Sequence, residues 1–126
     1  MSTKPVAARI PVYRFWLFML PIGTSAKALS KYKVLWKEVE EPEPGDLATC
    51  QKAPIKGGAT GLLLHLPVKR HPSTTMHECL HAAHMILDMV GIDVDPEDDE
   101  ALAYLQEWLV NMVDDHFYKR KVDYYK

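Results

Sequence analysis

The sequence predicts a single α+β domain, residues 1–126, in which a small antiparallel or mixed β-sheet of about three strands packs against two or three helices. The length allows one hydrophobic core and leaves little room for a second domain. Residues 10–68 contain short β-branched and aromatic stretches separated by turn residues, which is typical of strands. Residues 73–116 show a helical spacing of apolar residues, and residues 117–126 form a short basic tail.

Three segments of the first half are predicted to be strands, at residues 12–20, 33–39 and 61–66. Their apolar, β-branched and aromatic side chains favour a pleated, packed surface. The third strand follows the Gly57-Gly58 turn. The segment 40–46, between the second and third strands, is rich in proline and acidic residues, so it is expected to be a polar loop.

The apolar stretch at residues 15–22 has a second interpretation. It follows basic residues and precedes Ala26-Lys-Ala28, so it resembles an export signal with a cleavage site. Because prolines 11 and 21 interrupt the stretch and its aromatic residues favour packing, we interpret it as a buried strand. No apolar run reaches the roughly 18 to 20 residues that span a bilayer, and the two cysteines form no CxxC pair. We therefore expect a cytoplasmic protein with no membrane partner.

Two helices are predicted in the second half of the chain. Residues 73–75 offer N-cap side chains and Gly91 a stop, which predicts a helix near 74–90. Asp95-Pro96 supplies an N-cap followed by proline at the first helical position, which opens a second helix that runs to about residue 115. At about 100° per residue, the apolar residues of the first helix share one broad face. Cys79 lies on that face and is expected to be a small buried hydrophobe.

Charge is distributed unevenly along the chain. The formal net charge is -2, but the segment 71–118 contains eleven of the 17 acidic residues and none of the 15 basic residues. Such a segment repels phosphate and attracts cations. From the overall charge we expect no nucleic-acid partner. The acidic segment fits either a solvated helix face or a metal site.

The first helix carries the motif His77-Glu78-Cys79-Leu80-His81, which has the pattern HExxH. Two histidines four residues apart present imidazole nitrogens to one ion, and the glutamate beside the first histidine is a candidate general base. The alternative is a capping box of Thr75 and Glu78, with both histidines on a solvated face. The absence of Lys and Arg from this helix favours the metal site.

A catalytic zinc ion needs a third protein ligand and an open position for water. His84 lies on the same helix face, but three imidazoles along one straight face reach a tetrahedral ion poorly, so it is either a cleft-wall residue or an exposed bystander. Glu100 and Glu107 share one face of the second helix with Tyr104. An antiparallel helix pair would bring Glu107 nearer to the histidines, and a crossed pair favours Glu100.

The motif His77-Glu78-x-x-His81, followed eighteen residues later by Glu100, resembles the gluzincin zinc peptidases. With the sequences Glu100-Ala-Leu-Ala-Tyr104 and Leu62-Leu-Leu-His-Leu66, the chain is similar to small zincin-like proteins encoded by bacteriophages and prophages. The resemblance covers roughly residues 60–113 and implies a minimal zincin-like fold.

Carried over to this sequence, the resemblance implies that His77, His81 and Glu100 hold a zinc ion and that Glu78 is the catalytic base. Tyr104 would be a hydrogen-bond partner of Glu100 or a donor to the developing oxyanion, with core packing as the alternative.

The resemblance also implies a role for the predicted strand at 61–66. It would be the sheet edge along which an extended peptide pairs, with His65 lining the same cleft; an ordinary core strand is the alternative.

The sequence therefore predicts a zinc-dependent metallopeptidase that hydrolyses a peptide bond in a peptide or protein substrate. A catalytically inactive zinc-binding module, which keeps the fold for structure or for contact with a partner protein, is the first alternative. A metal-free helical protein whose acidic face is merely solvated is the second.

Overall fold

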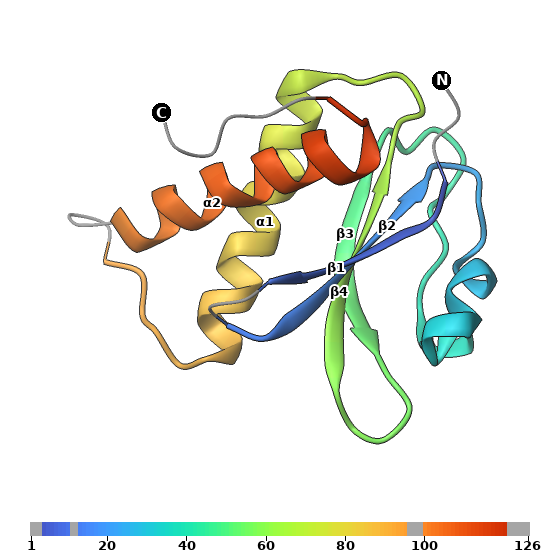
Figure 1. Ribbon diagram of the computed structural model, residues 1–126, viewed down its shortest axis with the longest axis horizontal. Coiled ribbons are helices and arrows are strands. Elements are labelled where there is room, and N and C mark those ends of the chain that lie inside the picture. The colour runs from blue at the N-terminus through green and yellow to red at the C-terminus, as the bar shows by residue number, and fades with distance from the viewer. Residues whose placement is uncertain (1–3, 11–12, 96–99, 121–126) are drawn as a thin grey trace.

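A computed structural model describes residues 4–10, 13–95 and 100–120 (Figure 1). The strands and long helices are β1 (Val6–Ile10), β2 (Phe15–Pro21), β3 (Thr49–Pro54), β4 (Thr60–Leu66), α1 (Pro72–Met89) and α2 (Glu100–Met112). Two 3-10 helices, η1 (Ala26–Tyr32) and η2 (Trp36–Glu38), lie between β2 and β3, and a π-helical turn, η3 (Val113–Phe117), follows α2. The predicted α+β class, a small mixed sheet packed against helices, is confirmed. Within the described residues, no helix is both long and apolar enough to cross a membrane.

The four strands form one mixed sheet in the order β1-β2-β4-β3. β2 and β4 pair in parallel at the centre, and β1 and β3 pair antiparallel with them as the two edge strands. Residues 61–66 of β4 are all buried, as expected for a strand covered on both faces. The expectation that this strand is the sheet edge is therefore wrong, because β2 pairs with it on one side and β3 pairs with its residues 60–65 on the other.

Two of the three predicted strands differ in the structure. In the described part of the segment 12–20, the strand begins at Phe15, because Arg14 turns the chain with a φ of 58°. The buried-strand interpretation of the apolar stretch is confirmed. The strand expected at 33–39 is not formed. Lys33 ends η1 with a φ of 64°, Val34 makes an isolated bridge to Ile55, and η2 follows. The apolar residues of this segment cover the sheet instead of joining it.

Different elements pack against the two faces of the sheet (Figure 1). On one face, sheet residues such as Leu64 form a core with Cys79 and Ile86 of α1, and α2 crosses α1. On the opposite face, η1 and η2 enclose a second core in which Leu29 packs with Leu63. The helices that carry the acidic residues therefore lie on one side of the sheet, and the lysine-rich segment 26–39 lies on the other.

The helix ends follow local rules. α1 begins at Pro72, two residues before the predicted start, because proline is tolerated where the first amide lacks an intrahelical partner. It ends as predicted near Gly91, whose φ of 78° lets Ile92 donate its N–H to the Leu87 carbonyl at 2.9 Å. The start expected for the second helix at Pro96 lies outside the described residues.

An ion pair joins the entry of α1 to the exit of α2. Arg70 donates Nε and Nη2 to the two carboxylate oxygens of Asp114, at 2.7 and 2.9 Å. The Tyr118 hydroxyl donates to the Pro67 carbonyl at 2.7 Å beside this pair. The bidentate geometry fixes direction as well as distance, so it holds η3 against the segment that leads from β4 into α1.

His65 is fully buried on the face of β4 opposite α1. Its Nε2 donates to the Thr24 carbonyl at 3.1 Å, its Nδ1 lies 3.4 Å from Thr49 Oγ1, and the Glu41 carboxylate is 3.9 Å away. Burial lowers the pKa of His65, and the Thr24 bond and Glu41 only partly oppose this. The expectation that His65 lines the same cleft as the HExxH motif is wrong, because alternate residues of a strand point to opposite faces.

We predict that Asp114→Ala lowers the free energy of unfolding by about 2 to 3 kcal/mol, because it leaves the Arg70 guanidinium half-buried without its partner. Urea denaturation measures this loss. Asp93→Ala, which makes the same change at an exposed loop residue, is the control. Equal stability of the two variants would show that the ion pair does not hold the helices.

We predict that the free energy of unfolding decreases as the pH falls below about 6.5, the value for His65 in the unfolded chain. The unfolded chain takes up a proton there that the folded chain, with its lowered His65 pKa, does not bind, so the loss continues down to the folded pKa. Urea titrations at pH 7 and pH 5 measure it. His65→Gln keeps an N–H donor for Thr24 and should show a smaller pH dependence; the same dependence in both proteins would refute the assignment.

Candidate metal centre

The two motif histidines converge on one point beside α1. The Nε2 atoms of His77 and His81 lie 3.1 Å apart, and their rings meet edge to face with centroids 4.6 Å apart. Two imidazole nitrogens bound to one tetrahedral zinc ion lie about 3.3 Å apart, given bonds of about 2.0 to 2.1 Å. The observed pair therefore has the spacing of two ligands of a single ion.

Glu78 completes a group of three side chains whose potential ligand atoms lie close together. One of its carboxylate oxygens lies 4.0 Å from His77 Nε2, and the ligand atoms of His77, Glu78 and His81 all lie within 4.8 Å of one another. Within the described residues, this group could hold a metal ion. The predicted HExxH cluster is thus assembled in the structure.

The packing of α1 explains why these side chains differ in exposure. Each residue is rotated by about 100° from the one before, so the two histidines face solvent when Cys79 faces the sheet. Glu78 lies between these directions, and its side chain is only 9% exposed, against 67% for His77. Burial raises the pKa of Glu78, while His81 and His77 oppose the shift. The group therefore joins an accessible imidazole pair to a desolvated carboxyl.

A hollow of about 380 Å³ opens beside Glu78. It lies between the first turns of α1 and the loop that leads into β3, and its lining residues are Gly45, Asp46, Leu47, Ala48, Ser73, Thr74, His77 and Glu78. From the sequence, residues 40–46 are predicted only to be a polar loop. No local pattern connects this loop with the HExxH motif, because the register of β3 on β4 brings them together.

Neither cysteine provides a thiolate. Burial, with Glu78 nearby, raises the pKa of Cys50 to about 12, and burial also raises the pKa of Cys79 far above its usual range. The Cys50 thiol lies 3.8 Å from the sulfur of Met85. The expectation that Cys79 is a buried hydrophobe is confirmed, since it belongs to the core under α1.

The structure does not place the candidate third ligands in the three-residue group. Glu100 is the first residue of α2 and is exposed, and Glu107 and His84 are exposed as well. Gln106 of α2 donates to the Met76 carbonyl at 3.0 Å, so the helices cross near the start of α1. Glu100 is in the first turn of α2, six residues before Gln106 along the helix. Its role as a ligand stays a prediction.

Tyr104 is 70% exposed and lies on the surface of α2. Core packing, the alternative considered for this residue, is therefore wrong. Its pairing with Glu100 and its contact with an oxyanion stay predictions.

We predict that zinc binds at one site per chain in isothermal titration, and that His77→Ala or His81→Ala weakens it by at least about 100-fold, because each removes one of the two converging nitrogens. His84→Ala, the same change one turn further along, should leave the affinity unchanged. The same titration is applied to Glu100→Gln and Glu107→Gln. The variant with the lower zinc affinity identifies the third ligand. Equal affinity in the wild type and the first two variants would contradict the centre.

Comparison with known proteins finds no matching family model, no matching curated protein and no matching solved structure. The function of this chain is therefore inferred from the geometry and chemistry of its own residues.

Proposed function

We propose that the chain is a zinc-dependent hydrolase that cleaves peptide bonds, with His77 and His81 as zinc ligands and Glu78 as general base. The observation that carries this proposal is the pair of Nε2 atoms, 3.1 Å apart, beside a buried carboxyl group. Imidazole suits zinc, and catalytic zinc sites combine two histidines and a carboxylate with an open position. The exposure of both histidines leaves room for a substrate.

The residues divide the chemistry between them. His77 and His81 would hold a zinc ion, which would polarise the scissile carbonyl group and lower the pKa of a bound water. Glu78 takes the proton from the attacking water and delivers it to the leaving amine. Its raised pKa favours this exchange, because a general base works best when its pKa approaches the working pH. Glu100 is the proposed third ligand, and Tyr104 the proposed partner of that ligand or of the oxyanion.

The edge position of β3 supports a peptide substrate. β3 has one strand neighbour, β4, and it begins beside the hollow that Glu78 lines. At its far end, Leu35 donates to the Pro54 carbonyl at 2.9 Å and covers that part of the edge. The first residues of β3 are the part next to the hollow. An extended peptide that adds to this part of the edge would pass the metal centre.

A catalytically inactive zinc-binding module is the second candidate. The exposure of Glu100 and Tyr104, outside the three-residue group, favours it. In such a module the ion would stabilise α1 or contact a partner protein, and Glu78 would have no chemical role.

We predict that Glu78→Gln retains zinc and lowers hydrolysis by about 100-fold or more, because the amide cannot accept a proton. The assay follows cleavage of a peptide mixture by mass spectrometry, with zinc-loaded protein and zinc content measured in parallel. Glu43→Gln makes the same change in an exposed loop and should keep full activity.

The two candidates give different results in this experiment. Cleavage that depends on Glu78 supports the hydrolase. Zinc binding without cleavage in the wild type contradicts it and favours the inactive module.

A further inference from the structure

A surface on the face of the sheet opposite α1 combines cations with aromatic rings. The residues of this surface come from β1, β2, η1, η2 and the segments beside them. We call it the basic-aromatic face, and its members are Arg9, Lys27, Lys31, Lys33, Lys37, Lys56, Trp16, Tyr32 and Trp36.

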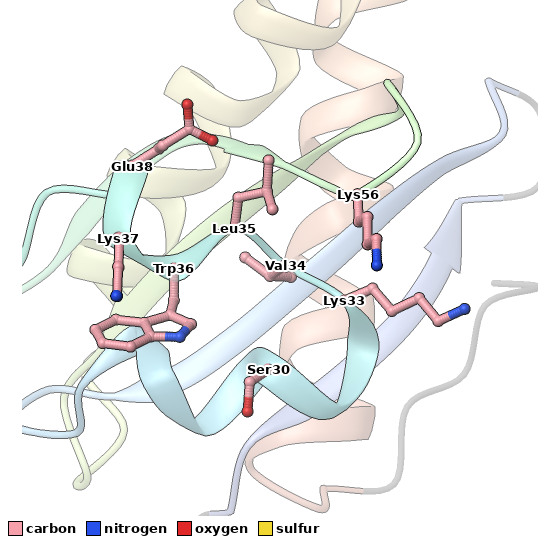
Figure 2. A pocket seen from close by; sticks show the side chains of 8 residues that line it. All are labelled: Ser30, Lys33, Val34, Leu35, Trp36, Lys37, Glu38 and Lys56. Atoms are coloured by element: carbon pink, nitrogen blue, oxygen red, sulfur yellow. The ribbon is translucent and has the colours of Figure 1, made fainter.

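Two hollows run along the basic-aromatic face. One, of about 460 Å³, is lined by Ser30, Lys33, Val34, Leu35, Trp36, Lys37, Glu38 and Lys56 (Figure 2). The other, of about 230 Å³, is lined by Trp16, Phe18, Lys31, Tyr32, Lys33 and Ile55. Lys33 borders both, and its carbonyl accepts a hydrogen bond from the Lys56 amide at 2.8 Å. The two hollows are therefore neighbours with Lys33 between them, and we refer to them together as the groove.

The rings of Trp16, Tyr32 and Trp36 each have a cation beside them. The Arg9 guanidinium lies 5.2 Å from the Trp16 ring, and the Lys37 ammonium lies 5.6 Å from the Trp36 ring. Figure 2 shows Lys37 beside that ring and Lys33 and Lys56 extending on the other side of the hollow. Trp16 is 37% exposed, so its ring is accessible to a ligand. A flat ligand that carries negative charge would find here both a ring to stack on and a cation to pair with.

The cations of this face have no carboxylate partners within the described part of the chain. The ion pairs found there use Arg70 and histidines, and none uses a lysine of the groove. Glu38 lines one hollow and is outnumbered there by Lys33, Lys37 and Lys56. Like charges gathered without counter-charges weaken a fold, so the arrangement favours an external polyanion. The net charge of -2 conceals this face, because the acidic helices lie across the sheet.

The backbone at Lys33 gives a second indication. Lys33 ends η1 in the left-handed region, with φ 64° and ψ 23°, where glycine is the favoured residue. A lysine there is less favourable for the backbone and places an ammonium group between the two hollows.

We propose that the basic-aromatic face binds single-stranded nucleic acid with little sequence preference. Unpaired bases would stack on the exposed Trp16 ring and on the half-buried Tyr32 and Trp36 rings. Backbone phosphates would contact the flanking lysines. An acidic polypeptide would use the cations and leave the row of rings without a partner. A duplex would offer phosphates but no unstacked bases. The proposal is independent of the metal centre, which lies on the other face.

The test measures fluorescence anisotropy of a labelled 15-nucleotide oligothymidylate, titrated with the full chain in EDTA. We expect binding that weakens roughly 50-fold between 50 and 200 mM salt if four phosphates are contacted. Lys33→Gly suits the backbone and should weaken binding roughly fivefold at 0.1 M salt. Trp36→Leu keeps an apolar side chain and should weaken it about tenfold. Lys52→Gln, on the helix-bearing face of β3, is the matched control and should bind as the wild type does.

Three results would overturn the proposal. The first is no binding at 50 mM salt. The second is equal binding of the oligonucleotide by the wild type, Lys33→Gly and Trp36→Leu. The third is equal or tighter binding of polyglutamate or of a duplex of the same length, which would assign the face to an acidic protein or to phosphate alone. Circular dichroism of each variant confirms that the fold is retained.

Discussion

The arrangement of this protein depends on the packing of α1 on two sides. The sheet takes one side of the helix and α2 crosses another, so a narrow strip of α1 remains in contact with solvent. Helical geometry then fixes which residues occupy that strip. His77 and His81 lie on it, and Glu78 falls at its border with the sheet. One packing constraint thus produces an accessible imidazole pair and a desolvated carboxyl. The ion pair of Arg70 with Asp114 helps to hold the second helix where this constraint requires it.

The local parts of this arrangement could be predicted from the sequence. α1 and the metal group lie within one continuous helix, whose apolar spacing and motif are short-range patterns. β3 could not be predicted, because Lys52 and Pro54 interrupt any alternation and its strand character comes from pairing with β4. The strand predicted at 33–39 was wrong for a related reason. Val34 and Val39 are apolar because they cover the sheet, and a covering segment has the same composition as a strand.

The third metal ligand could not be predicted from the sequence. The distance from Glu100 to the histidines depends on the angle and offset at which α2 crosses α1, which no pattern within either helix encodes. The structure shows a crossed pair, with the Gln106 side chain bonded near the start of α1. A crossed pair was the condition that favoured Glu100 over Glu107, yet both carboxylates are exposed. Helix crossing alone therefore does not decide between the two carboxylates.

The change of charge along the chain becomes a separation in space. Basic residues of η1 and η2 and acidic residues of α1 and α2 cover opposite faces of the same sheet. Packed layers are about 10 Å apart, so the two surfaces lie roughly 20 Å from each other. This exceeds the Debye length of about 8 Å at physiological ionic strength. A cation at the His77–His81 pair and a polyanion at Lys33 would therefore interact weakly. The sheet lets one small domain present two surfaces of opposite charge, each with its own ligand chemistry.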